Sequence, residues 1–192
     1  MLERYDQKTI SLHWLGVALL ALAWGGAQVI DFFPKGPIKI NARSVHMALG
    51  LLFGFVMVYR LWWRRNHGRR FAETGTPMIQ SLTRWVHFGL YVLIFAEVMF
   101  GLANVWGRGD VIFNLLKVPA FDTGDKLLKE QVEYIHKSVA NAILIVVGIH
   151  AAAALIHHFI WRDNVLRRML PKGFSKPSTI DQESPIESTR TP

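Results

Sequence analysis

The chain has 192 residues, of which 51% are hydrophobic and 19% charged, with a formal net charge of +8 and no cysteine. Its long uncharged runs exclude a water-soluble enzyme, because a soluble helix shows polar residues on one face at every turn. The absence of cysteine excludes disulfides, thiolate zinc sites, iron–sulfur clusters and covalently attached haem. The basic residues flank apolar runs and form no separate domain, so we expect no nucleic-acid binding.

Four apolar runs follow one another along the chain. Each is long enough to cross a hydrocarbon core of about 30 Å at about 1.5 Å per residue. We predict membrane-spanning helices at about 9–30, 43–63, 80–106 and 134–161. The predicted fold class is therefore all-α, an integral membrane four-helix bundle. It forms a single domain over residues 1–171, and we expect the Pro-, Ser- and Thr-rich segment 172–192 to be a disordered cytoplasmic tail.

The charges between the runs predict the orientation of the bundle. Five arginines and no acid lie between Arg60 and Arg70, and the chain after the fourth run is basic, with Asp163 as the one acid as far as Lys176. The connection from Arg108 to Lys137 is balanced, with five basic and five acidic residues. Since cytoplasmic loops carry an excess of Lys and Arg, we expect both termini and the 64–79 loop to lie in the cytoplasm.

Histidines inside the apolar runs need an explanation, because a bilayer disfavours titratable groups. Counted from the outer ends of their runs, His13 and His150 each lie 17 residues inward, and His46 and His136 each lie 3 residues inward. These counts give two depths, about 25 Å and about 5 Å from the outer face. His136 and His150 are 14 residues apart. At about 100° per residue that spacing is about 40° short of four turns, so both face into the bundle.

Two histidines at one depth on different helices are a usual way for a helix bundle to hold a metal or a haem. Two neutral imidazoles on opposite sides of an iron leave no open position, which suits electron transfer. His87 lies near the deeper level and competes as a ligand. Each histidine by itself would also fit a hydrogen bond between helices. A transporter that passes Zn²⁺ or a similar ion is a further alternative, although Glu97 is the one carboxylate within the runs.

The chain resembles the bacterial cytochrome b561 family over about residues 5–171. The resemblance rests on the four-span layout and on three segments, ISLHWL around His13, VHMALGLLFGFVMVYRLWWR around His46, and YIHKSVANAILIVVGIHAAAALIHHFIWRDNVLRRMLP from Tyr134 to Pro171. The third segment is the specific one, since it holds both His136 and His150 and a further histidine pair before WRDN. Glu97 departs from the apolar residue or proline expected in the family.

The resemblance implies an inner-membrane cytochrome with two haems b. Carried over by position, His13 and His150 would ligate the cytoplasmic-side haem iron, and His46 and His136 the periplasmic-side haem iron. It also implies an oxidoreductase that oxidises superoxide at the outer face and reduces ubiquinone as the electron acceptor. The partners would be membrane lipid, quinone, and superoxide or a redox protein. The alternative is a cytochrome b subunit that carries electrons between a partner dehydrogenase and quinone.

Quinone reduction consumes protons, so titratable groups mark candidate quinone or proton sites. They are His157, His158 and Arg162 near the inner surface, Lys137 near the outer haem, and His87 and Glu97 within the third run. For Glu97 a protonated or hydrogen-bonded carboxyl facing the bundle and a proton relay are both open. Cations on the outer side could attract an anion such as superoxide; they are Lys35, Lys39, Arg43, Lys117, Lys126 and Lys129. Five acids share the longer of these loops, which favours ordinary solvated loop charge.

Overall fold

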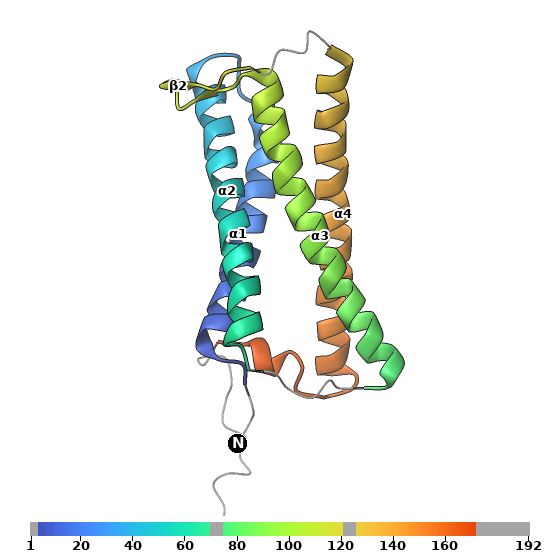
Figure 1. Ribbon diagram of the computed structural model, residues 1–192. Helices are drawn as coiled ribbons and strands as arrows, with labels where there is room; N and C mark the ends of the chain where they lie inside the picture. Colours follow the sequence, from blue (N-terminus) through green and yellow to red (C-terminus); the bar gives the residue numbers. More distant parts are fainter. Residues whose placement is uncertain (1–3, 70–74, 121–125, 172–192) are drawn as a thin grey trace, which may run out of the picture.

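The structure, a computed structural model, describes residues 4–69, 75–120 and 126–171. Four long helices stand side by side in one bundle (Figure 1). They are α1 (Gln7–Ile30), α2 (Pro37–Asn66), α3 (Pro77–Arg108) and α4 (Lys126–Phe159). The other described elements are a hairpin of β1 (Val111–Ile112) and β2 (Leu116–Lys117) and the 3₁₀ helix η1 (Arg167–Met169).

Each of the four helices is long and apolar enough to cross a membrane, with mean hydropathy between 1.5 and 2.3 over its most apolar window. The prediction of a mostly helical chain with four such helices is confirmed. Each helix begins before its predicted span, α2 at Pro37 and α4 at Lys126, whereas α4 ends at Phe159, two residues before its predicted end. Composition located the apolar part of each helix, whereas hydrogen bonding continues for further turns through polar residues.

Side chains and backbone geometry at the helix ends explain where the helices start and stop. Asp6 caps α1 by accepting a hydrogen bond from the Thr9 amide at 2.9 Å. Thr76 caps α3, which has proline in its first turn, where the amide that proline lacks has no helical partner. Gly109 ends α3 with φ of 63°, a left-handed conformation that glycine adopts without strain.

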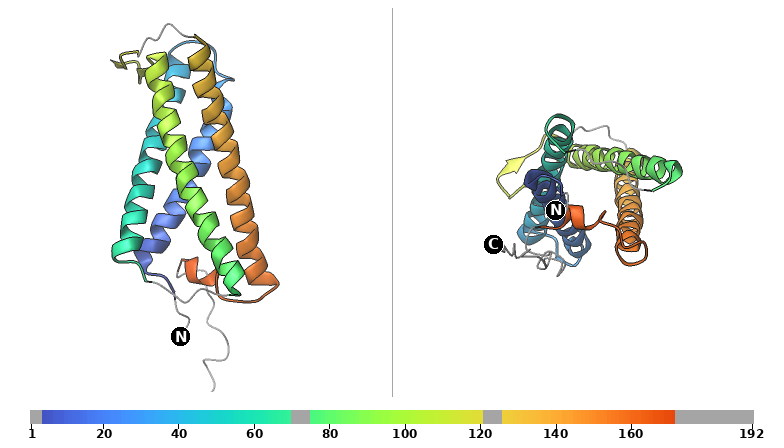
Figure 2. Two further views of the ribbon diagram at one scale, coloured as in Figure 1. Left: turned by 45° about the vertical axis from the view of Figure 1, so that its right-hand side comes forward. Right: turned by 90° about the horizontal axis from the view of Figure 1, so that it is seen from below.

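The bundle consists of two helix pairs. α1 packs mainly against α2, and α3 packs mainly against α4, while α2 and α3 are in more limited contact (Figure 2). A buried apolar cluster joins all four helices and contains Leu19, Phe53, Met57, Ile94 and Ile143. Many large apolar side chains point outward instead, which is the surface that a lipid bilayer covers and that water does not favour.

The two ends of the bundle are closed differently. At the end that holds the start of α1, the Trp14 indole donates a hydrogen bond of 2.8 Å to the Met169 carbonyl, so η1 packs against α1. At the opposite end, the buried Ser44 hydroxyl accepts a hydrogen bond of 2.8 Å from the Phe113 amide and fixes the hairpin on α2. The start of α1 and the end of α4 therefore share one end of the bundle. The predicted tail, 172–192, lies outside the described residues.

Candidate haem-binding histidine pairs

The first histidine pair consists of His13 on α1 and His150 on α4. Their ring centroids are 6.4 Å apart and their planes are inclined at 74°. The pair lies toward the end of the bundle that holds the start of α1. His87 on α3 adjoins it, with its ring centroid 5.1 Å from that of His150 and its Nδ1 2.8 Å from the Thr83 carbonyl. The first pair therefore has a third imidazole beside it.

The second histidine pair consists of His46 on α2 and His136 on α4, toward the hairpin end of the bundle. Their ring centroids are 6.3 Å apart and their planes are inclined at 81°. His46 Nδ1 lies 2.9 Å from the Ala23 carbonyl on α1, and it donates to this oxygen when the proton is on Nδ1. That tautomer leaves Nε2 with a free lone pair, which is the form that binds a metal.

The ring separations fit two imidazoles that ligate opposite sides of one metal ion. Imidazole nitrogens bind first-row metals such as zinc at about 2 Å, and the ring centre lies about 1.1 Å beyond the nitrogen, so opposed ring centroids lie about 6.2 Å apart. The separations of 6.4 Å and 6.3 Å agree with this value. The His87 to His150 separation of 5.1 Å is too short for that arrangement.

A cavity of about 960 Å³ adjoins the second pair and is lined by residues of all four helices. Its size lies at the upper end of the range for cofactor pockets. Gly50, one turn beyond His46, lines the cavity, and a Cβ there would meet no atom within 4 Å. Gly101 approaches His136 so closely that a Cβ would lie 3.2 Å from the imidazole Cε1. The glycine positions thus leave room for a flat group beside the second pair.

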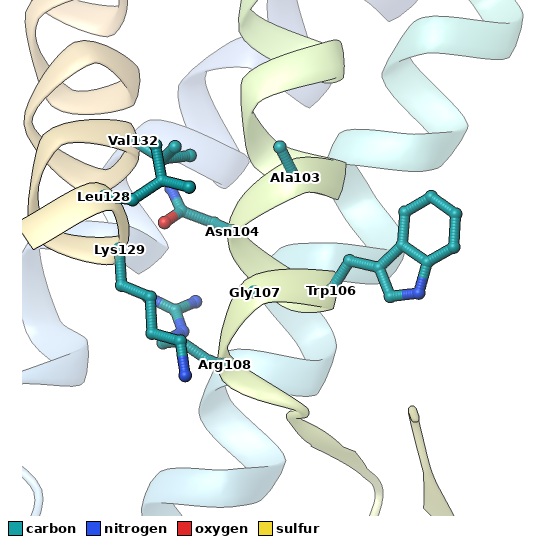
Figure 3. A pocket seen from close by; sticks show the side chains of 8 residues that line it. All are labelled: Ala103, Asn104, Trp106, Gly107, Arg108, Leu128, Lys129 and Val132. Atoms are coloured by element: carbon teal, nitrogen blue, oxygen red, sulfur yellow. The ribbon is translucent and has the colours of Figure 1, made fainter. Parts of the chain in front are cut away.

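A smaller pocket of about 300 Å³ lies between the end of α3 and the start of α4 (Figure 3). The side chains of Asn104, Leu128 and Val132 face the space between the two helices, while Trp106 points away from it. This pocket shares Ala103, Asn104, Trp106 and Arg108 with the larger cavity. Its lining is otherwise mostly apolar, and it holds none of the histidines.

Glu97 faces the bundle interior beside the second pair. Its Oε1 lies 3.1 Å from His136 Nδ1, and its Oε2 is buried without a hydrogen-bond partner. Within the described residues, His136 Nδ1 forms no hydrogen bond, so the two side chains are in close contact without one. Of the two roles that the sequence left open for Glu97, the structure thus places the carboxyl inside the bundle and beside a predicted ligand.

Arg60 corrects one step of the sequence analysis. That analysis counted it among the basic residues of a cytoplasmic loop, whereas its side chain lies inside the bundle and is 6% exposed. Arg60 Nη1 donates a hydrogen bond of 2.6 Å to the Tyr91 hydroxyl, and Nη2 lies 3.5 Å from His13 Nδ1. One signal could have found it, since Arg60 follows His46 by 14 residues, the spacing that puts His150 on the face of His136.

The remaining candidates for quinone or proton chemistry do not form one cluster. His157 pairs with Asp163 beyond the end of α4 and packs edge-on against Trp161. His158 contacts Phe159, and Arg162 adopts a left-handed backbone conformation with φ of 52°. Lys137 lies at the opposite end of the bundle, 2.7 Å from Glu133, and lines the large cavity. His87 and Glu97 lie beside the first and the second histidine pair, respectively.

Two of the cations expected on the outer side have carboxylate partners. Lys39 lies 3.0 Å from Asp31, and Arg43 lies 4.0 Å from Asp110. The hydrogen bond and the charge of Lys39 lower the pKa of Asp31. Lys39 and Arg43 thus each have an anionic neighbour, which favours the interpretation of ordinary paired surface charge over a field that attracts superoxide.

Helices that can cross a membrane, with histidines facing one another across the bundle, define the class of helix-bundle proteins that hold a metal or haem in their core. Among the described residues, no group of three or more His, Asp or Glu side chains is arranged to hold a metal ion. This gives no support to the transporter alternative.

Comparison with known proteins identifies the family. Residues 4–172 match the model of the prokaryotic cytochrome b561 family. The chain is 29% identical to the "Probable superoxide oxidase CybB" of Yersinia pestis, over 90% of this chain and 98% of that protein. It is 28% identical to "Cytochrome b561 homolog 1" of Escherichia coli K12, over 89% and 99%, and 28% identical to homolog 2, over 90% and 94%. The chain belongs to the prokaryotic cytochrome b561 family, haem-binding electron-transport proteins of bacterial membranes.

Proposed function

We propose that this chain is a diheme cytochrome b of the bacterial inner membrane, with one haem b at each histidine pair. His13 and His150 would ligate one iron, and His46 and His136 the other. The observation that carries the proposal is the equal separation of the two pairs, 6.4 Å and 6.3 Å, at two levels of one bundle. A haem b held in this way supplies reversible one-electron chemistry with no open position for oxygen.

The residues between the pairs would keep the two sites apart and dry. His136 and His150 are separated by 14 residues of one helix, or about 21 Å along its axis. Ile143 on α4, Phe53 and Met57 on α2 and Leu19 on α1 lie between the two levels and belong to the buried apolar cluster. Such a layer excludes water, and it holds the helices that carry the histidines in a fixed register.

We further propose that the chain oxidises superoxide at the periplasmic face and reduces ubiquinone. The similarity to a protein named as a superoxide oxidase supports this assignment. In balance, two superoxide ions give up one electron each and leave as dioxygen, and ubiquinone takes two electrons and two protons to become ubiquinol. Protons would come from the titratable groups at the ends of the bundle, among them His157 with Asp163 and Lys137 with Glu133.

Loop charge supports an orientation with the first pair toward the cytoplasm. Arg64, Arg65 and Arg69 follow or end α2 at the same end of the bundle as the first pair, and the positive-inside tendency places such an end in the cytoplasm. The hairpin end and the second pair would then face the periplasm. Superoxide produced outside the membrane would therefore meet the second pair first.

The test is the reduced-minus-oxidised absorption spectrum of the detergent-purified chain, with a pyridine haemochrome count. We expect two haems b per chain and reduction of both by superoxide in the absence of any other protein. Two haems that superoxide does not reduce, together with a copurifying dehydrogenase, would favour the cytochrome b subunit instead. A folded chain that binds no haem under haem-replete expression contradicts the proposal.

A further inference from the structure

A buried guanidinium flanks the first histidine pair, and a half-buried carboxyl flanks the second. Arg60 on α2 lies beside His13, with Nη2 3.5 Å from the imidazole Nδ1. Glu97 on α3 lies beside His136, with Oε1 3.1 Å from Nδ1. The two ligand sets are chemically alike, so these neighbours are the clearest difference between them.

The charge of Arg60 is not neutralised within the described part of the chain. Its side chain is 6% exposed, its Nε is buried without a hydrogen-bond partner, and no described carboxylate forms an ion pair with it. Its one short contact is with the neutral Tyr91 hydroxyl, at 2.6 Å. Arginine stays protonated in proteins, so the site keeps a full positive charge.

Glu97 is also without a cation partner other than the ligand histidine. Among the described residues, its one ion-pair contact is with His136, and its second oxygen is buried and unpartnered. The cations at that end pair with other acids. Arg108 lies 3.0 Å from Asp110 and 3.7 Å from Glu133, and Lys137 lies 2.7 Å from Glu133.

The sign of each effect follows from electrostatics. A fixed positive charge beside an iron ligand favours the reduced form of the iron, which carries one positive charge less, and a carboxyl group there favours the oxidised form when it is ionised. Buried charges are screened weakly compared with exposed ones. Groups that contact the outer nitrogen of a ligating imidazole tune the bound metal in this way.

We propose that Arg60 and Glu97 set the two haem sites at different reduction potentials, higher at the first pair and lower at the second. This inference rests on the proposed binding of a haem at each pair. With a haem bound at each pair, these potentials would favour the transfer of one electron from the second site to the first, which would oxidise the former and reduce the latter. No proton or bond changes in this step. The charges thus give the bundle a preferred direction of electron flow, from the hairpin end to the end that holds the chain's first residues.

The test is a potentiometric titration of the purified two-haem protein, followed by its α-band absorbance. We expect two components in the unaltered chain. Arg60→Gln should lower the higher potential, and Glu97→Gln should raise the lower one. In each variant the equilibrium constant for moving an electron between the sites should fall about tenfold or more. The interaction of an iron with a weakly screened unit charge a few ångströms from its ligand is large enough to change this constant tenfold.

Matched controls use charges on the same face of the membrane that do not contact a histidine. Arg65→Gln on α2 and Glu130→Gln on α4 remove exposed charges and should leave both potentials unchanged. Arg60→Lys keeps the charge and should stay close to the original potential, which separates charge from packing. Haem content is counted in every variant, so that loss of a haem, which would question the proposed function, is distinguished from an unshifted potential. Two bound haems with potentials that do not move in Arg60→Gln and Glu97→Gln overturn the inference.

Discussion

The two histidine pairs are alike in their own geometry and unlike in their surroundings. Their ring separations differ by 0.1 Å, 6.4 Å against 6.3 Å, and both have strongly inclined ring planes. The first pair is packed against a buried guanidinium and a third imidazole. The second pair adjoins a large cavity, a half-buried carboxyl and two glycines.

This contrast shows how one bundle can distinguish two sites without changing their ligands. The ligand type is fixed by histidine, and the helices repeat it at two levels. The variables that remain are the nearby charge, the space beside the rings and the number of neighbouring polar groups, and these are the means by which proteins tune haem. Experiments that alter one surrounding at a time can break or sharpen the comparison.

The largest effect is expected from removing one member of a pair. His136→Ala should leave one haem per chain, held by the first pair, and His13→Ala should leave one haem held by the second, because each site depends on its own two imidazoles. Pyridine haemochrome analysis against protein concentration measures the ratio. Loss of both haems from either variant would show that the two sites do not form independently.

His87→Leu is the matched control at the first pair, since it removes an imidazole that lies even closer to His150. Its ring separation of 5.1 Å does not fit an opposed ligand, so we expect two haems to remain. If His87→Leu lost a haem and His13→Ala did not, the first pair would consist of His87 and His150.

A smaller effect, confined to the second pair, is expected from filling its cavity. Gly50→Leu adds a side chain where a Cβ meets no atom within 4 Å, so the bundle should fold while the space beside His46 is lost. We expect about one haem per chain, because the space for the second haem is filled. Leucine suits a helix better than glycine, so the substitution should not weaken α2. Gly25→Leu, on α1 and outside the cavity lining, has the same open surroundings and should keep two haems.

The smallest effect concerns the cap of α1, at the end of the bundle nearest the first pair. Burial alone would raise the pKa of Asp6, but hydrogen bonds from the Thr9 hydroxyl and amide and from the Trp63 indole outweigh it and lower the pKa from 3.8 to about 2. Asp6→Ala should cost about 1 kcal/mol of stability, as expected for a lost N-cap.

The pH dependence of this contribution has a definite sign. Because the pKa is lower in the folded chain, the charged form stabilises the fold above about pH 4, and the stabilisation is lost as the pH falls toward about 2. Thermal unfolding followed by tryptophan fluorescence, at pH 6 and at pH 3, should show a larger fall in midpoint for the unaltered chain than for Asp6→Asn. Equal falls would contradict the assignment of the shift to Asp6.

Much of the fold was accessible from the sequence because the bilayer restricts it. A span must be helical and apolar over about 20 residues, so composition alone located four helices. The hairpin between α3 and α4 gave no such signal. Its strands have two residues each. The hairpin is held by hydrogen bonds between Ser44 and the hairpin backbone and between Asn114 and the Pro37 carbonyl. The partners in these bonds are 67 to 77 residues apart in the chain.

The sequence by itself determined the depth and the facing of the histidines, because the rise and rotation of a helix are constant. A spacing of 14 residues therefore puts His136 and His150 on one face at two levels. Only the tertiary structure decided which groups surround each pair. Arg60 reaches His13 from α2, and Glu97 reaches His136 from α3, and both contacts depend on how neighbouring helices are rotated and tilted against one another. No rule of spacing along a single helix fixes that rotation, since it comes from the packing of side chains between helices.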